Sequence, residues 1–193
     1  MDGATILITG MGLAVAAGLN AYIPLMVAGL LVRFDVVSFG DPYDILGSTP
    51  ALIIIGVLLA VELLADKVPA VDSVNDAVQT VIRPASGAVL FAAAASGADW
   101  QWAQALAVIV GLLTALGVHS TKAAARPVIN VTTAGVGGPV ASVVEDGFSL
   151  GLALAALLAP LIALGLLVGL AWFAVSAIGR IRRRRSGAPA ASA

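Results

Sequence analysis

Residues 62–84 read E-L-L-A-D-K-V-P-A-V-D-S-V-N-D-A-V-Q-T-V-I-R-P, a polar string within an otherwise apolar chain. After Pro69, the polar side chains recur three or four residues apart, which places them along one face of a helix. They are Asp72, Asn75, Asp76, Gln79 and Arg83. Such a stripe is either the solvated face of a helix lying on the membrane or a half-helix lining a polar cavity. Its acidic and amide-rich character favours the cavity, because helices resting on anionic lipid are rich in Lys and Arg.

The rest of the chain has the composition of a membrane protein. Of its 193 residues, 60% are hydrophobic and 11% are charged, and the mean hydropathy is +1.05. A helix needs about 20 apolar residues to cross the hydrocarbon core. Five stretches are predicted spans: Ala4–Val32, Pro50–Ala65, Arg83–Ala98, Trp102–His119 and Ser149–Ile178. We therefore predict an all-α, polytopic transmembrane helix bundle of about five spans, with residues 1–179 forming a single transmembrane domain.

The distribution of basic residues predicts the orientation of the bundle. Five arginines lie within residues 180–193, which we expect to form a disordered tail on the cytoplasmic side under the positive-inside rule. The amino end has no cleavable signal peptide pattern, so its apolar stretch should remain as a span. Five crossings then place the amino end outside, Arg33 inside and both long polar connections outside.

This topology conflicts with the positive-inside rule at four basic residues. Lys67, Arg83, Lys122 and Arg126 would all lie in the outer connections. We therefore interpret these connections as re-entrant or interfacial polar hairpins. Prolines amid their apolar residues support this interpretation, because irregular backbone at membrane depth is tolerated where protein or water shields it.

A weak internal repeat points to a duplicated architecture. Residues 56–67 (G-V-L-L-A-V-E-L-L-A-D-K) align without a gap with residues 111–122 (G-L-L-T-A-L-G-V-H-S-T-K). The same alignment pairs Asn75 with Asn130 and Pro84 with Pro139. The two candidate repeats cover residues 51–98 and 106–153. Duplications of this kind are common in transporters.

Polar residues in and beside the predicted spans are candidates for binding a substrate or ion. The set is Asn20, Glu62, Asp66, Lys67, Asp72, Asn75, Asp76, Arg83, Lys122, Arg126, Asn130, Glu145 and Asp146. An unpaired carboxylate is costly in lipid, so Glu62 is either functional, or it reaches the interface near the span end or pairs with Lys67. The basic members suit an anionic solute or a lipid headgroup, or they form salt bridges with the acids. Glu145 and Asp146 are either a cation or proton site or an interface flank.

The first predicted span contains an interruption. Asn20 and Pro24 lie one turn apart, and proline removes a backbone donor and kinks a helix. A broken helix facing the polar hairpins would complete a cavity. The alternative is a packing kink in which Asn20 bonds to a neighbouring helix.

Several functions are excluded or disfavoured. The net charge of −1 argues against nucleic acid as a partner, and the absence of cysteine removes thiolate chemistry. The only histidine, His119, is predicted to be a satisfied buried or interfacial imidazole. We find no phosphate loop or catalytic motif, and expect no enzyme activity, cofactor or metal. Glycines four apart, at 147 and 151 and at 165 and 169, indicate close helix contacts within the bundle or in a homo-oligomer.

Four strings carry a resemblance to a known family. Residues 17–24, 62–76, 82–84 and 145–147 resemble the bacterial membrane family known as domain of unknown function 4126, over about Leu7 to Leu167. The resemblance implies a multi-pass protein of a bacterial inner membrane without an established activity. We expect a transporter- or channel-like protein that moves a small solute or ion. The alternative is a non-transporting scaffold or lipid-interacting envelope protein.

Overall fold

The computed structural model describes residues 2–66, 69–98 and 102–186. This part of the chain contains seven α-helices, one short 3-10 helix and no strand, which confirms the predicted all-α class. The helices are α1 (Gly3–Leu19), α2 (Tyr22–Arg33), α3 (Thr49–Ala65), α4 (Pro69–Ala94), α5 (Ala103–Thr132), α6 (Gly137–Leu158) and α7 (Pro160–Ser186), with the 3-10 helix η1 at Tyr43–Gly47. Among the described residues, four segments are long and apolar enough to cross a membrane: Asn75–Ala94, Ala103–Thr132, Gly137–Leu158 and Pro160–Ala177.

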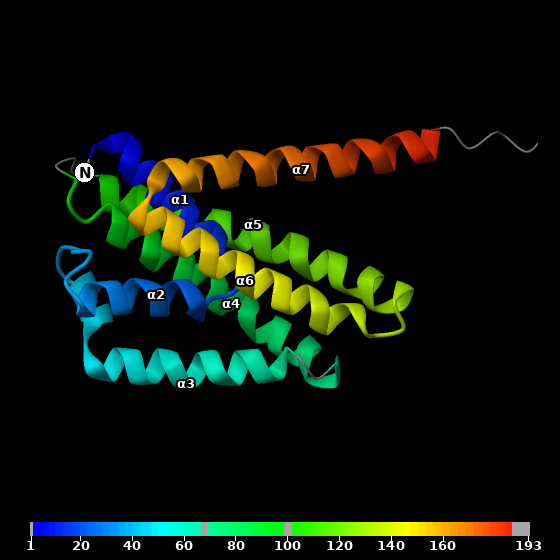
Figure 1. Cartoon of the computed structure of the whole chain (residues 1–193), viewed down its shortest axis with the longest axis horizontal. Helices are drawn as coiled ribbons and strands as arrows, with labels where there is room; N and C mark the ends of the chain where they lie inside the picture. The colour runs from blue at the N-terminus through cyan, green and yellow to red at the C-terminus, as the bar shows by residue number, and fades with distance from the viewer. Residues whose placement is uncertain (1, 67–68, 99–101, 187–193) are drawn as a thin grey trace, which may run out of the picture.

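The prediction of a single first span over Ala4–Val32 is wrong, because two short helices occupy this stretch. Asn20 has an extended backbone (φ −144°, ψ 124°) and ends α1. Its side-chain oxygen accepts hydrogen bonds from the backbone N–H groups of Tyr22 and Ile23, at 3.0 Å each, and so caps α2. Pro24 falls in the first turn of α2, where a missing N–H costs little. The chain therefore reverses here, and α2 runs back toward the end of the bundle where α1 begins (Figure 1).

The predicted re-entrant hairpins are replaced by long continuous helices. α4 runs from the polar string through Pro84 into apolar sequence, and α5 similarly passes through Pro127. The predicted spans Arg83–Ala98 and Trp102–His119 therefore overlap only the apolar parts of longer helices, α4 and α5. The polar residues of α4 and α5 remain helical because neighbouring helices inside the bundle supply their hydrogen-bond and ion-pair partners.

The other predicted spans have mixed outcomes. α3 matches the predicted span Pro50–Ala65 closely, since Ser48 caps it and Pro50 lies in its first turn. The predicted span Ser149–Ile178 is divided between α6 and α7. Ala159 leaves the helical region (φ −149°, ψ 72°) because a residue before proline avoids the α conformation.

The helices α3 to α7 alternate in direction along the bundle (Figure 1). One end of the bundle, which we call the N-terminal end, holds the start of α1 and η1. At this end α4 also finishes, α5 begins and α6 passes into α7. The end of α3, the start of α4, the α5–α6 connection and the last turns of α7 lie at the other end, the C-terminal end.

This arrangement corrects the predicted sides of the polar connections. Arg33, at the end of α2, lies at the N-terminal end, opposite the last turns of α7, and not on the same side. The connections predicted to lie opposite the tail lie at the same end as the last turns of α7. The predicted last span is two antiparallel helices, α6 and α7, so the polar connections lie on the same side as the end of α7. The reversal between α1 and α2 places Arg33 at the end where α1 begins. The conflict with the positive-inside rule disappears.

Small side chains allow the helices to approach closely around α1. Leu13, Ala16 and Ala17 on α1 are fully buried against residues of α4, α5 and α6, including Leu90 and Leu152.

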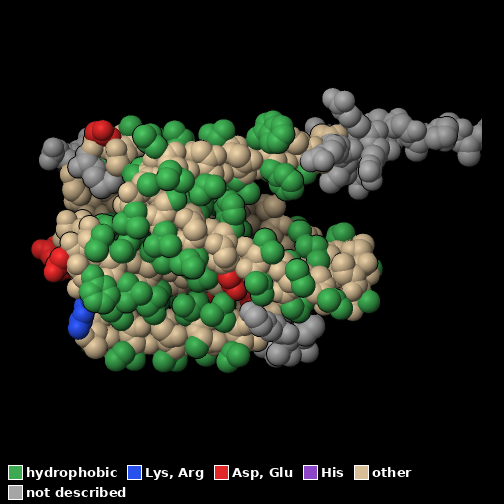
Figure 2. Space-filling model, in the orientation of Figure 1, with side chains coloured by type: hydrophobic (Ala, Val, Ile, Leu, Met, Phe, Trp, Pro, Cys, Tyr) green, Lys and Arg blue, Asp and Glu red, His purple; other side chains and the backbone are tan. Residues whose placement is uncertain are grey.

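The outer surface of the bundle is also apolar, since hydrophobic side chains cover most of the face in Figure 2. Charged side chains on that face lie mainly at the N-terminal end, apart from a small acidic patch near the middle. An apolar belt of this kind fits burial in lipid.

Candidate functional site

Charged side chains from four helices meet inside the bundle together with a serine and a histidine, and we call this group the charge cluster. Its members are Glu62 and Asp66 from the end of α3, Arg83 from α4, His119, Lys122 and Arg126 from α5, and Ser142 and Glu145 from α6. All are buried except Glu145, whose side chain is 21% exposed. Charges at this depth need partners, since an unpaired buried ion costs several kcal/mol, roughly.

The first half of the charge cluster is a buried ion pair extended by an imidazole. Arg83 Nη2 donates to Glu62 Oε1 at 2.9 Å, and both side chains are at most 1% exposed. Arg83 Nη1 lies 3.2 Å from His119 Nδ1, and His119 Nε2 lies 3.1 Å from Thr80 Oγ1. Arginine can only donate, so Nδ1 accepts and Nε2 carries the proton. The prediction of a satisfied buried imidazole at His119 is confirmed.

The second half of the charge cluster places two cations around one carboxylate oxygen. Glu145 Oε2 lies 2.9 Å from Lys122 Nζ and 3.2 Å from Arg126 Nη2. Asp66 Oδ2 lies 3.8 Å from both nitrogen atoms. Ser142 donates to Asp66 Oδ2 at 2.8 Å, and Asn75 donates to Asp66 Oδ1 at 2.7 Å. Asp66 is thus held firmly by neutral donors and lies at the centre of the network.

The break between α1 and α2 opens onto this cluster. Lys122 Nζ donates to the carbonyl oxygen of Leu19, the last residue of α1, at 3.2 Å. A cation at this position is favourable because the carboxyl end of a helix carries partial negative charge. Asn20 Nδ2 donates to Asp146 Oδ1 at 2.9 Å, which ties the break to α6. Both interpretations of Asn20 are therefore partly realised: the helix is broken, and Asn20 bonds to a neighbour.

Most of the predicted site residues come together in space. The structure joins Asn20, Glu62, Asp66, Asn75, Arg83, Lys122, Arg126, Glu145 and Asp146 by the contacts given above. Asp76 is half-buried one turn before Thr80, whose hydroxyl donates to the Asp76 carbonyl. Asn130 is half-buried one turn beyond Arg126, toward the α5–α6 connection. Lys67 and the side chain of Asp72 lie outside the described residues, so the predicted pairing of Glu62 with Lys67 is untested.

Three members of the network, Ser142, Thr80 and His119, were not among the predicted site residues. Ser142 contacts both Asp66 and Arg126, and Thr80 contacts His119. The spacing contained a usable signal for Ser142, because it lies three residues before Glu145 and so shares its helical face. Thr80 follows Asp76 by four residues on the predicted polar face of α4. Hydroxyl groups are common in helices, however, and neither position is distinguished by charge.

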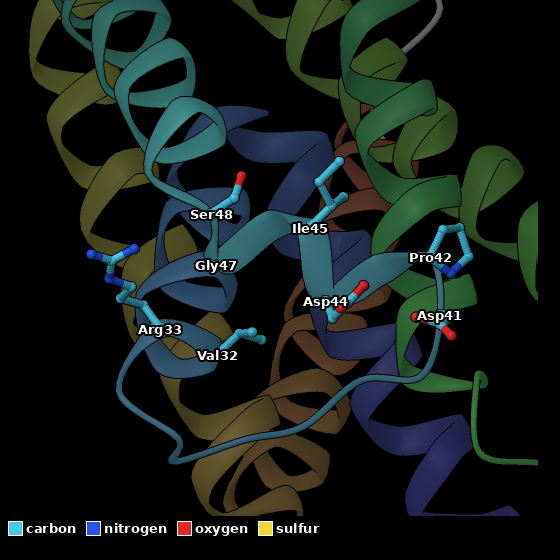
Figure 3. A pocket seen from close by; sticks show the side chains of 8 residues that line it. All are labelled: Val32, Arg33, Asp41, Pro42, Asp44, Ile45, Gly47 and Ser48. Atoms are coloured by element: carbon cyan, nitrogen blue, oxygen red, sulfur yellow. The ribbon is translucent and has the colours of Figure 1, made fainter.

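A separate depression lies at the N-terminal end of the bundle. It has a volume of about 760 Å³ and is open to the surface. Figure 3 shows that Asp41 and Asp44 line one side of it, while Arg33 extends along the other. Arg33 donates to Thr49 Oγ1 at 2.8 Å. Within the described residues, no group of three His, Asp or Glu side chains has the arrangement of a metal site. The charge cluster is therefore the stronger candidate site.

The fold and the charge cluster define an integral membrane protein, built from helices that enclose ionised side chains. The family model described as "Domain of unknown function (DUF4126)" matches residues 7–180. The chain belongs to this family, as the resemblance of its polar strings predicted. No match was found among the curated proteins or among the solved structures.

Proposed function

We propose that the protein is a small transporter- or channel-like membrane protein, and that the charge cluster binds the solute or ion that it moves. The observation that carries this proposal is the position of the cluster at a helix break inside an apolar bundle. In transporters, broken helices commonly supply backbone groups to a polar site near the middle of the membrane.

The energetic cost of the cluster supports a functional role. Replacing a buried ion pair with apolar side chains is often neutral or stabilising by about 1–4 kcal/mol. Three buried cations and three carboxylates therefore stabilise the helix packing no better than apolar side chains would. Ionisable residues inside a membrane bundle mark solute or ion pathways by default.

The burial pattern supports access from the C-terminal end. Asn75, Asp76, Glu145 and Asp146 are only half-buried and lie on the α4 and α6 segments that lead to that end. Toward the N-terminal end, fully buried apolar side chains such as Leu13 and Leu90 close the bundle. A solute would thus reach the cluster from one side first, as alternating access requires.

The predicted duplication and assembly belong to the same proposal. Repeats at 51–98 and 106–153 would suit a transporter, although Pro84 lies in the middle of α4 and Pro139 in the first turn of α6. Exposed apolar side chains on α7 would be covered by lipid or by a second copy in a homo-oligomer. We also propose a bacterial inner-membrane location, a cytoplasmic carboxyl tail and no enzymatic activity.

The alternative is a non-transporting scaffold or lipid-interacting envelope protein. One observation favours it: each of Arg83, Lys122 and Arg126 already has a carboxylate partner within the chain. A fully paired network could serve only to fix the register of the helices. The two functions differ in whether the cluster exchanges its partners for a solute.

Currents from proteoliposomes on a solid-supported membrane test the proposal. We would apply concentration jumps of sodium, potassium and ammonium salts of chloride, nitrate and acetate to the full-length protein. We expect a saturable current with at least one of these ions, and its loss in Arg126→Gln that is still folded. No current beyond empty liposomes would favour the scaffold, whereas equal currents from the wild type and Arg126→Gln would show that the transported ion does not bind at the cluster. Arg33→Gln is the matched control, because Arg33 lies at the bundle end, away from the cluster.

A further inference from the structure

Lys122 and Arg126 are paired differently from Arg83. Arg83 and Glu62 form a one-to-one pair in which both side chains are essentially inaccessible. Lys122 and Arg126 lie one turn apart on α5 and direct their terminal nitrogens at the same oxygen atom, Oε2 of Glu145. Two cationic donors converging on a single oxygen is the arrangement that recognises an oxyanion.

Glu145 is the acid of the cluster that can leave most easily. Its side chain is 21% exposed, whereas Glu62 and Asp66 are each 1% exposed. It is carried by α6, which packs mainly on α1 and α2 and less on α5. The two ion pairs of Glu145 and the hydrogen bond from Arg126 to Ser142 link the side chains of α5 and α6.

The charge that remains after Glu145 withdraws defines the class of ligand. Asp66 stays, because Asn75 and Ser142 hold it. Two cations and one carboxylate then leave one uncompensated positive charge at the subsite. The nearby Asp146 is bound to Asn20 and points to the helix break. A ligand with one negative charge would restore neutrality, whereas a multiply charged anion would be repelled by Asp66.

The depth of the subsite indicates where the ligand comes from. Glu145 lies eight residues into α6, or about 12 Å along the helix from Gly137 at 1.5 Å per residue. A small water-soluble anion can reach this depth through the half-buried side chains at the C-terminal end. A phospholipid headgroup would have to leave the interface and draw its acyl chains past charged residues.

We propose that Lys122 and Arg126 form an anion-binding subsite for a small, soluble, monovalent oxyanion such as a carboxylate, and that Glu145 occupies this subsite in the unliganded protein. The inference rests on the proposed function for its claim that the anion is the transported solute. Binding itself can be measured without transport. Displacing Glu145 would also loosen α6 from α5, which gives ligand binding a direct structural consequence.

Chemical rescue by acetate tests this subsite. The variant Glu145→Ala removes the internal carboxylate, and acetate supplies the same group from solution. In uncharged detergent at constant ionic strength, we expect sodium acetate to raise the Tm of Glu145→Ala saturably. Its apparent affinity should be about tenfold or more tighter than in the wild type, where Glu145 competes. The double variant Glu145→Ala/Arg126→Gln should lose the effect, and Asp44→Ala, an exposed acid at the other end, should behave as the wild type.

Several results would overturn the subsite. Equal acetate responses of Glu145→Ala with and without Arg126→Gln would show that acetate acts elsewhere. A response to added phosphatidylglycerol but not to acetate would make the ligand a lipid headgroup. If Glu145→Ala does not fold, acetate titration of wild type against Arg126→Gln decides, since equal shifts contradict the proposal. Acetate binding without current would instead count against transport and leave the subsite standing, whereas current without binding would remove only the subsite.

Discussion

At the scale of single residues, the buried Glu62–Arg83 ion pair predicts a large loss of stability when only one of its two partners is replaced. Its atoms are 2.9 Å apart and inaccessible to solvent. The variant Glu62→Leu leaves the Arg83 guanidinium without its carboxylate and should lower the free energy of unfolding by ~3–5 kcal/mol. The double variant Glu62→Leu/Arg83→Met should recover most of this loss. Unfolding in mixed micelles measures both, and a double variant no more stable than the single one would contradict the pairing.

Asn20 has two separable roles, one local and one between helices. Its side-chain oxygen caps α2, and its amide nitrogen binds Asp146. Asn20→Ala removes both and should lower the free energy of unfolding by ~1–2 kcal/mol or more. Asn20→Ser keeps a capping oxygen and should lose less. The same unfolding titration compares them, and indistinguishable stabilities for Ala and Ser would show that the cap is unimportant.

The candidate site could be predicted largely at this scale because charge in an apolar sequence is conspicuous. Nine of the predicted residues pair inside the bundle, in three groups joined by hydrogen bonds and ion pairs, and the cost of an isolated intramembrane ion explains why the charged ones found partners. Their pairing could not be predicted. Glu62 pairs with Arg83, on the neighbouring helix, and sequence distance says nothing about which of several cations an acid will contact.

At the scale of helices, α4 and α5 form the most extensive contact of the bundle. A side chain on Gly111 would collide with the backbone oxygen of Gly87, and one on Gly87 would lie 2.5 Å from Ala115 Cβ. Gly111→Ala should therefore separate the helices and destabilise the protein by roughly 1–3 kcal/mol. Gly117→Ala is the matched control on the same helix, because a methyl group there meets nothing within 4 Å.

The two glycine variants are compared by their thermal unfolding in detergent. Gly117→Ala should be neutral, or more stable by up to ~1 kcal/mol, because alanine favours the helix. A Gly111→Ala protein as stable as Gly117→Ala would mean that α4 and α5 are not in contact at this point.

The helix ends show where sequence reasoning failed at this scale. Asn20 and Pro24 were correctly identified as an interruption, but hydropathy is the same for a kinked span and for two helices that reverse. The outcome depends on the capping bonds to Tyr22 and Ile23 and on the fit of small α1 residues against α4 and α5. These are tertiary contacts, which local sequence does not encode.

At the scale of the whole molecule, the two ends of the bundle carry opposite charge. The acids Asp2, Asp35, Asp41 and Asp44 belong to the N-terminal end, and the arginine-rich residues 180–185 lie in the last turns of α7 at the other. Residues 180–186, predicted to begin a disordered tail, are therefore helical. The positive-inside rule then predicts a cytoplasmic C-terminal end. Because the chain has no cysteine, single introduced cysteines report the orientation directly.

Two exposed positions test this orientation. Ile45→Cys on η1 should react with a membrane-impermeant thiol reagent in intact cells. Val136→Cys in the α5–α6 connection should react only after the membrane is permeabilised. Both native side chains are well exposed, 64% and 68%, so burial does not explain a difference. The reverse labelling pattern would invert the topology.

The most direct test of the central claim is whether water-borne reagents reach the charge cluster. Single cysteines at Asn75 and Glu145 lie at its half-buried edge, and Leu113→Cys, on an exposed apolar position of α5, is the lipid-facing control. In permeabilised membranes, we predict that a hydrophilic thiol reagent modifies the first two, that acetate slows the reaction at position 145, and that Leu113→Cys stays unreactive. No reaction at positions 75 and 145 in folded protein, or equal reaction at all three, would contradict a solute-accessible site and leave the cluster a purely structural network.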